Sequence, residues 1–260
     1  MDALILLSFT LSVLLGIART ADLLLGTDPV SGLCVVGPVW VRYAALGAAV
    51  LAAVLVGRHC AGNAKNLQQP KKSAGVLSAL AGVLLVVTAG LRLYFAQFMG
   101  VTWGIRAVLE LLCAVWMLVL ARSWLSKTGW TAPKGGLPLA VLGSVLFYWN
   151  VLMRFMENSS SWHRAAPTSA VWQMLAALLF LSALARALYL PEPGNGKALC
   201  ASGLAAFCLC LCWEFPQLVQ GLVYPGGYLT DIPFHAALCL IGMLGGVCAA
   251  GTAYNARHAQ

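Results

Sequence analysis

Residues 74–98 read AGVLSALAGVLLVVTAGLRLYFAQF, a run in which Arg92 is the sole charged side chain. An α-helix needs about 20 apolar residues to cross the ~30 Å of hydrocarbon in a bilayer, so this run predicts a membrane span. A charge within such a run is costly in lipid, and Arg92 is therefore expected to face a protein interior or a wet cavity. A long apolar run with polar side chains near one end recurs along the whole chain.

The composition is that of a chain whose solvent is lipid. Hydrophobic residues make up 61% of the sequence and charged residues 9%, whereas a soluble domain carries about 25% charged residues. Eight apolar segments can be read, at 3–23, 38–57, 74–98, 104–124, 137–157, 169–189, 198–222 and 233–254. They predict an all-α polytopic membrane protein with eight transmembrane helices arranged as four hairpins. The connections are short, so residues 1–260 are expected to form a single transmembrane domain without a separate soluble one.

The basic residues are divided unevenly between the two sides of the predicted bundle. Most of the 16 Lys and Arg fall in the connections after the second, fourth and sixth segments and near the C-terminus. Because such residues are enriched in cytoplasmic loops, we predict a multi-pass protein of the cell membrane with both termini in the cytoplasm. The first segment has no basic region before it and no clear cleavage site after it, so we expect it to be retained as a helix. The net charge of +8 follows from this bias, and no nucleic-acid partner is expected.

Most intramembrane polar side chains lie near the ends that this orientation places outside. The candidate ligand-binding residues are Arg19, Arg92, Arg106, Glu110, Arg154, Glu214, Gln217 and His235, with Tyr148 and Trp149 as an aromatic wall. Groups of this kind at one depth predict an outward-facing polar cavity. A guanidinium suits carboxylate and phosphate, so Arg92 and Arg154 are expected to hold an anion, with Glu214 as counter-ion or proton carrier. The alternative is that these charges pair with one another or reach the lipid headgroups, and that the aromatic side chains form an interfacial belt.

The polar positions also suggest an internal repeat of two-helix units. Aligned by eye, the ascending helices place Arg19, Arg92, Arg154 and Gln217 at one position and Asp22, Phe95, Glu157 and Gln220 three residues later. Units of two helices would be parallel repeats. A general pattern of polar residues at helix ends explains the same alignment without a repeat.

Three further patterns concern helix shape and contact. Pro216 is expected to kink the seventh helix near Glu214, because proline removes a backbone hydrogen bond. The Gly- and Pro-rich loop 24–38 is expected to fold back over the cavity as a lid. Small residues that repeat every four positions predict close helix contacts, in the stripes Ala45-x3-Ala49-x3-Ala53, Ala74-x3-Ser78-x3-Gly82 and Gly242-x3-Gly246-x3-Ala250.

No metal or cofactor is expected. Cys208, Cys210 and Cys212 alternate on a predicted helix, where positions i, i+2 and i+4 do not converge on one point, so they are interpreted as small apolar residues. His163 and His235 belong to no zinc-binding spacing, and no phosphate-binding loop or catalytic serine motif is present.

Three classes of function remain. The first is a membrane protein that binds or transports a small polar or anionic solute, or a lipid headgroup, in the polar cavity. The second is a non-catalytic membrane subunit, such as a sensor or permease partner, in which the polar residues fix helix packing and the partner is another membrane protein. The third, which is the least favoured, is an intramembrane enzyme acting on lipids, with Glu214 or His235 as acid or base.

Overall fold

The computed structural model describes residues 3–28, 32–60, 64–127, 129–156, 165–190, 192, 194–223 and 231–258. Within these ranges, eight helical stretches are long and apolar enough to cross a membrane, and the prediction of an all-α polytopic membrane protein is confirmed. The helices are α1 (Ala3–Leu25), α2 (Val39–Cys60), α3 (Lys72–Met99), α4 (Val101–Leu125), α5 (Gly136–Met156), α6 (Ala165–Tyr189), α7 (Asn195–Ala206), α8 (Glu214–Val223) and α9 (Ile232–His258). A short 3₁₀ helix, Ala64–Gln68, precedes α3.

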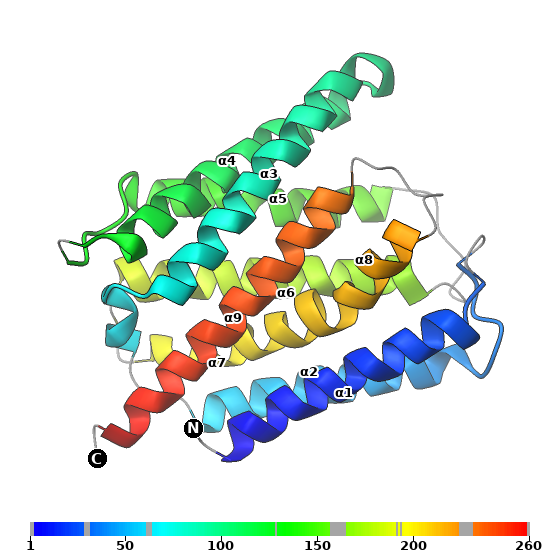
Figure 1. The fold of residues 1–260 in the computed structure, drawn as a ribbon, viewed down its shortest axis with the longest axis horizontal. Helices are drawn as coiled ribbons and strands as arrows, with labels where there is room; N and C mark the ends of the chain where they lie inside the picture. The colour runs from blue at the N-terminus through cyan, green and yellow to red at the C-terminus, as the bar shows by residue number, and fades with distance from the viewer. Residues whose placement is uncertain are drawn as a thin grey trace.

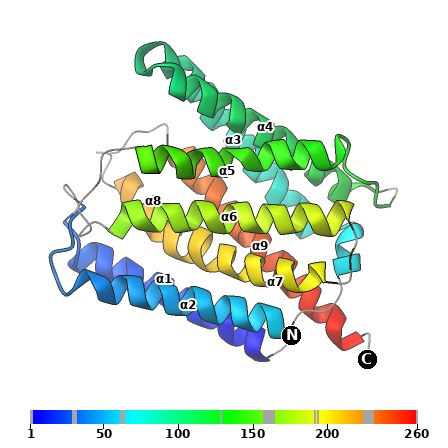
Figure 2. The ribbon, with the colours of Figure 1, turned by 180° about the vertical axis from the view of Figure 1, so that it is seen from behind.

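The spans form the four predicted hairpins, which are α1–α2, α3–α4, α5–α6 and α7–α8 with α9. Figures 1 and 2 show α1–α2 at one edge of the bundle, α3–α4 at the other edge, and the remaining helices between them. The sixth, seventh and eighth spans are the most buried. The core contains large buried side chains such as Trp116 of α4, Phe147 of α5 and Phe180 of α6. Whether the hairpins are repeats of one another stays a prediction, as do the choice of membrane and the orientation.

The α3–α4 hairpin turns on one residue and leans away from the bundle toward its tip (Figure 1). Gly100 joins the two helices with φ 97°, in the left-handed region where glycine is favoured. Leu93, Phe98 and Val101 are exposed near this tip, at 46%, 73% and 80% of their surface. The hairpin therefore packs on the rest of the bundle mainly through the half remote from Gly100.

The seventh span is irregular where Pro216 predicted a kink. Residues Phe207–Trp213 form a π-helical segment between α7 and α8. Proline has no backbone N–H, so the carbonyl of Cys212 loses the donor that residue 216 would supply in an α-helix. That carbonyl lies against Gly16 of α1, where a Cβ atom would come within 2.6 Å of its oxygen. The π-helical segment thus allows two helix backbones to approach closely.

Other glycines also lie where two helix backbones come close together. Inside a bilayer the hydrophobic effect does not drive helices together, and close packing of this kind takes its place. A Cβ on Gly203 of α7 would lie 2.6 Å from the Gly245 carbonyl oxygen of α9. Gly242 meets the backbone at Leu211, whereas Gly246 faces the Phe207 ring. The predicted stripes on α3 and α9 therefore face neighbouring helices. Gly245 also makes a close contact, although it is not part of the predicted stripe on α9. The α2 stripe does so in part, since Ala53 is buried and Ala45 is exposed.

Candidate functional site

Polar side chains from seven helices, all of them buried or half-buried, meet near one end of the bundle. We call this set the polar layer: Arg19, Asp22, Arg42, Arg92, Arg106, Glu110, Gln173, Glu214, Asp231 and His235. Its members lie near the C-terminal ends of α1 and α3 and near the N-terminal ends of α2, α4, α6 and α9, while Glu214 begins α8. Antiparallel neighbours bring these ends together, so the layer is a direct result of the hairpin topology.

The first group in the polar layer joins α1 to α2. Arg19 donates to Asp22 from Nη1 to Oδ2 at 2.6 Å, one helical turn away on the same face. Arg42 donates to the other carboxylate oxygen of Asp22, with Nε 2.8 Å from Oδ1. The guanidinium of Arg19 also lies 4.7 Å from the centre of the Trp213 ring, a cation–π contact that links this group to the seventh span.

The second group joins α3, α4 and the start of α9. Arg92, which is 1% exposed, donates from Nε to Glu110 Oε1 at 2.8 Å and also pairs with Asp231. Arg106 lies on the same helix as Glu110, with 3.3 Å between its Nε and that carboxylate. Its guanidinium is 5.0 Å from the centre of the Phe234 ring. Glu110 therefore has a cation on each of two helices.

The third group centres on Glu214, directly after the π-helical segment. One carboxylate oxygen pairs with His235 of α9, and the other accepts a hydrogen bond from Gln173 Nε2 of α6. The same amide nitrogen lies 3.3 Å from the Leu209 carbonyl within the π-helical segment. Side-chain donors often satisfy carbonyls that an irregular helix releases inside a membrane. Gln173 thus holds the carboxylate and the irregular backbone at once.

Replacement of Gln173 by leucine should destabilise the protein, because the Gln173 amide makes both of these contacts. The variant removes a donor from a 1% exposed carboxylate and from the Leu209 carbonyl, and each unsatisfied buried group costs about 1–3 kcal/mol. We expect a lower midpoint of thermal unfolding in detergent, measured by circular dichroism. Gln220→Leu, at a partly exposed position on α8, is the control. Equal midpoints for the two variants would show that the Gln173 bonds contribute nothing.

The polar layer is balanced in charge within itself. Four arginines, Arg19, Arg42, Arg92 and Arg106, stand against four carboxylates, Asp22, Glu110, Glu214 and Asp231, so the layer is neutral when His235, the partner of Glu214, is uncharged. Burying an ion is tolerated when a counter-ion with good geometry accompanies it. The layer can therefore fix the helices at this end without any ligand.

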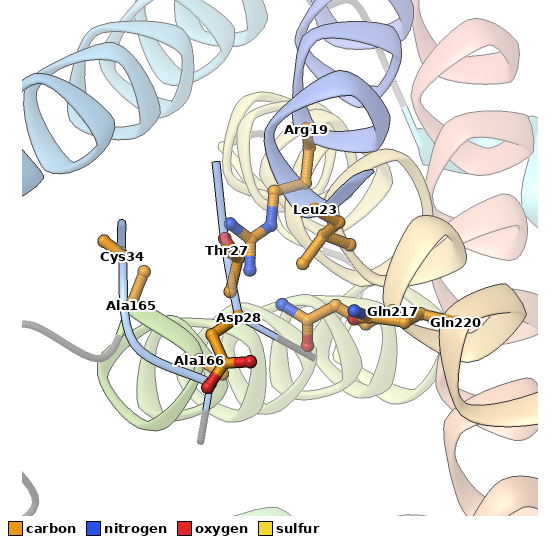
Figure 3. Close-up of a pocket in the computed structure, with 10 residues that line it drawn as sticks. Arg19, Leu23, Thr27, Asp28, Cys34, Ala165, Ala166, Gln217 and Gln220 are labelled. Atoms are coloured by element: carbon orange, nitrogen blue, oxygen red, sulfur yellow. The ribbon is translucent and has the colours of Figure 1, made fainter. Parts of the chain in front are cut away.

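A small cavity adjoins the first group, between the end of α1, the loop after it, the start of α6 and α8. It has a volume of about 120 Å³ and is lined by Arg19, Leu23, Thr27, Asp28, Gly32, Cys34, Ala165, Ala166, Gln217 and Gln220. Figure 3 shows the Arg19 guanidinium, the Asp28 carboxylate and the Gln217 amide pointing toward one another. The loop is held by an antiparallel bridge between Thr27 and Cys34. Part of the predicted lid thus forms a wall of this cavity.

The predicted site residues fall into three sets. Arg19, Arg92, Arg106, Glu110, Glu214 and His235 belong to the polar layer, and Gln217 lines the cavity. Trp149 is half-buried, and Tyr148 is 53% exposed. Arg154, expected inside with Arg92, is exposed and lies two residues before the end of α5 at Met156. Glu157 and His163 lie outside the described residues.

Asp231 was not among the predicted site residues. It directly precedes α9, where its backbone carbonyl accepts the His235 N–H, and its carboxylate reaches Arg92. Aspartate at a helix start is a capping signal, which would have placed it at the level of His235. No signal in the sequence indicates that its partner is on α3.

Comparison with protein-family models, with curated proteins and with solved structures gave no match. The function must therefore be argued from the geometry of the site alone.

Proposed function

We propose that this membrane protein binds a small polar solute, or the headgroup of a lipid, in the cavity between α1, α6 and α8. The observation that carries the proposal is the Arg19 side chain. It is 3% exposed, it lines the cavity, and its Nε atom has no hydrogen-bond partner among the described residues. A buried donor without a partner costs free energy, which a ligand would recover.

The size and charge of the cavity narrow the class of ligand. A water needs about 10–15 Å³, so a volume of about 120 Å³ has room for on the order of ten waters or one small polar group. Arg19 and Asp28 bring opposite charges to its wall, and Gln217 adds an amide whose Nε2 is buried without a partner. A group that carries both charges, or a neutral polar group, matches this wall better than a bare anion.

This proposal moves the binding role away from Arg92. Its guanidinium already pairs with Glu110 and Asp231, so an incoming anion would have to displace a carboxylate. The polar layer then supports the cavity by holding Arg19 and the seventh span in place. Glu214 accepts a hydrogen bond from Gln173 and is in ion-pair contact with His235, which supports a structural role for it as well.

A ligand screen on the purified protein tests the proposal. Thermal shift would be measured with amino acids and other free zwitterions, with phosphate and small carboxylates, and with vesicles of zwitterionic or anionic lipid. Gln217→Leu should weaken the response by about tenfold, since it removes a buried hydrogen-bond donor. Gln97→Leu, an exposed position on α3, should leave it unchanged.

The pattern of responses separates the sources of the ligand. A shift with free zwitterions assigns a solute, and a shift with vesicles alone assigns a headgroup. The proposal fails if no compound stabilises the wild-type protein or if Gln217→Leu responds as the wild type does. Solute-dependent flux in proteoliposomes would extend binding to transport.

One observation favours a second candidate, the non-catalytic membrane subunit. The apolar tip of the α3–α4 hairpin, which includes Leu93, Phe98 and Val101, is exposed beyond its contacts with the bundle. Together with the self-neutralised polar layer, this would suit a protein that packs against a partner in the membrane. Co-purification of a stoichiometric partner, lost on replacement of Phe98 by a charged residue, would support this reading.

A further inference from the structure

A second and larger hollow lies on another face of the bundle. It has a volume of about 500 Å³ and is walled by α2, α6 and α7, within the range of about 300–1,000 Å³ that small-molecule sites occupy. α2 and α6 both pack on α7 and touch each other little, so the groove between them has α7 as its floor. Figure 2 shows the three helices side by side on this face.

The groove is apolar over most of its length and basic at one end. Val50, Val54, Leu175 and Leu179 supply apolar walls. The basic end is formed by Arg58 near the end of α2 and Arg186 near the end of α6. Both side chains are exposed, and among the described residues neither pairs with a carboxylate.

The groove has the length of one leaflet of a bilayer. Arg186 follows Trp172 by 14 positions on α6, which is about 21 Å at a rise of ~1.5 Å per residue. One leaflet with its headgroup region is about 20–22 Å thick, which is half of the ~40–45 Å of a whole bilayer. Arg58 and Arg186 lie within about one helical turn of the ends of their spans, where long basic side chains reach the headgroup level. The basic end is therefore at headgroup depth and the apolar part is at acyl-chain depth.

We propose that this groove is a binding site for an anionic phospholipid, whose phosphate lies between Arg58 and Arg186 and whose acyl chain runs along α7 toward Trp172. Two guanidiniums at the mouth of an apolar channel match a phosphate that carries a hydrocarbon tail. A neutral lipid would leave one or both cations without a partner. A transmembrane helix of another protein would fill the apolar part but would need acids at its end to match the arginines. The headgroup end of the site lies at the end of the bundle opposite to the polar layer. The lipid site can therefore be tested independently of the function proposed above.

The test counts lipids retained by the full-length protein. The protein would be purified from nanodiscs that contain phosphatidylglycerol and phosphatidylcholine, and native mass spectrometry would report bound lipid for four forms. These are the wild type, R58Q/R186Q, the control R122Q, and S202F. Arg122 is an exposed arginine at the corresponding end of α4, outside the groove. Ser202 lines the groove on α7, so S202F blocks the acyl channel without changing a charge.

We expect the wild type and R122Q to retain one phosphatidylglycerol in preference to phosphatidylcholine. In R58Q/R186Q, affinity for phosphatidylglycerol should fall about 30-fold, since each basic residue near anionic headgroups contributes about fivefold. S202F should lose the retained lipid while its arginines remain. The proposal is overturned if R58Q/R186Q binds phosphatidylglycerol as tightly as the wild type, if R122Q loses it equally, or if S202F keeps it. Retention of a protein chain in place of lipid would also overturn it.

Discussion

Replacement of Arg92 by methionine is expected to lower the free energy of unfolding by about 3–5 kcal/mol, the usual cost of removing one partner from a buried ion pair. Arg92 is 1% exposed and pairs with Glu110, which is fully buried, and with Asp231. Methionine keeps most of the side-chain volume, so the effect reports the charge rather than a cavity. The carboxylate of Glu110 would keep the more distant Arg106 as its cation.

Reversible unfolding in mixed micelles would measure this loss. R106M is the matched control, because Arg106 is bound at 3.3 Å, has a side chain 27% exposed, and should cost less. The double variant R92M/E110Q should recover part of the stability, since it removes the buried charge left behind. Equal stability for R92M and the wild type would mean that the ion pair is not desolvated. A double variant less stable than R92M would mean that Glu110 acts through other contacts.

Leucine at Gly57 is expected to separate α2 from α7. An added Cβ would lie 2.6 Å from the backbone nitrogen of Ala201, so the helices must move apart by more than a rotamer change allows. Overpacking of this kind typically costs about 1–3 kcal/mol and more when backbone must shift. Gly203→Leu, against the Gly245 carbonyl, should have a comparable effect on the contact of α7 with α9.

The chain supplies its own controls for these substitutions. Gly90 and Gly104 are helical glycines with no atom within 4 Å of an added Cβ, so leucine there should leave stability unchanged or raise it through helix propensity. Thermal unfolding of the four leucine variants under identical detergent conditions gives the comparison. If Gly57→Leu and Gly104→Leu unfold at the same temperature, close backbone approach does not stabilise this bundle.

The fold was largely predictable because few backbone structures can cross a lipid bilayer. A chain that crosses hydrocarbon must satisfy its backbone within each segment, so apolar length alone marks a helix. The run 74–98, for example, lies within α3, Lys72–Met99. Pro216 gave the position of the irregular turn in the seventh span but not its form, since a proline predicts the loss of one backbone hydrogen bond and not a π-helical segment.

The site was predictable in depth but not in detail. Charges near the C-terminal end of one helix and the N-terminal end of its antiparallel neighbour had to lie at one level, and Arg19 with Asp22 at i, i+3 indicated a local pair. The pairing of Arg92 with Asp231, just before α9, could not be read from the sequence, because 139 positions separate the two residues. The cavity depends on how the loop after α1 meets α6 and α8, and no periodic pattern describes such a loop. Arg154 is exposed near the end of α5, and its expected role in binding stays a prediction.

The one-residue turn at Gly100 has a consequence for biogenesis. Because only Gly100 separates α3 from α4, we expect the two helices to insert into the membrane together as one hairpin. Arg92 and Glu110 both belong to this hairpin, so their charges can enter the bilayer as a neutralised pair without any later helix. Lengthening this turn should delay that pairing and lower the efficiency of insertion.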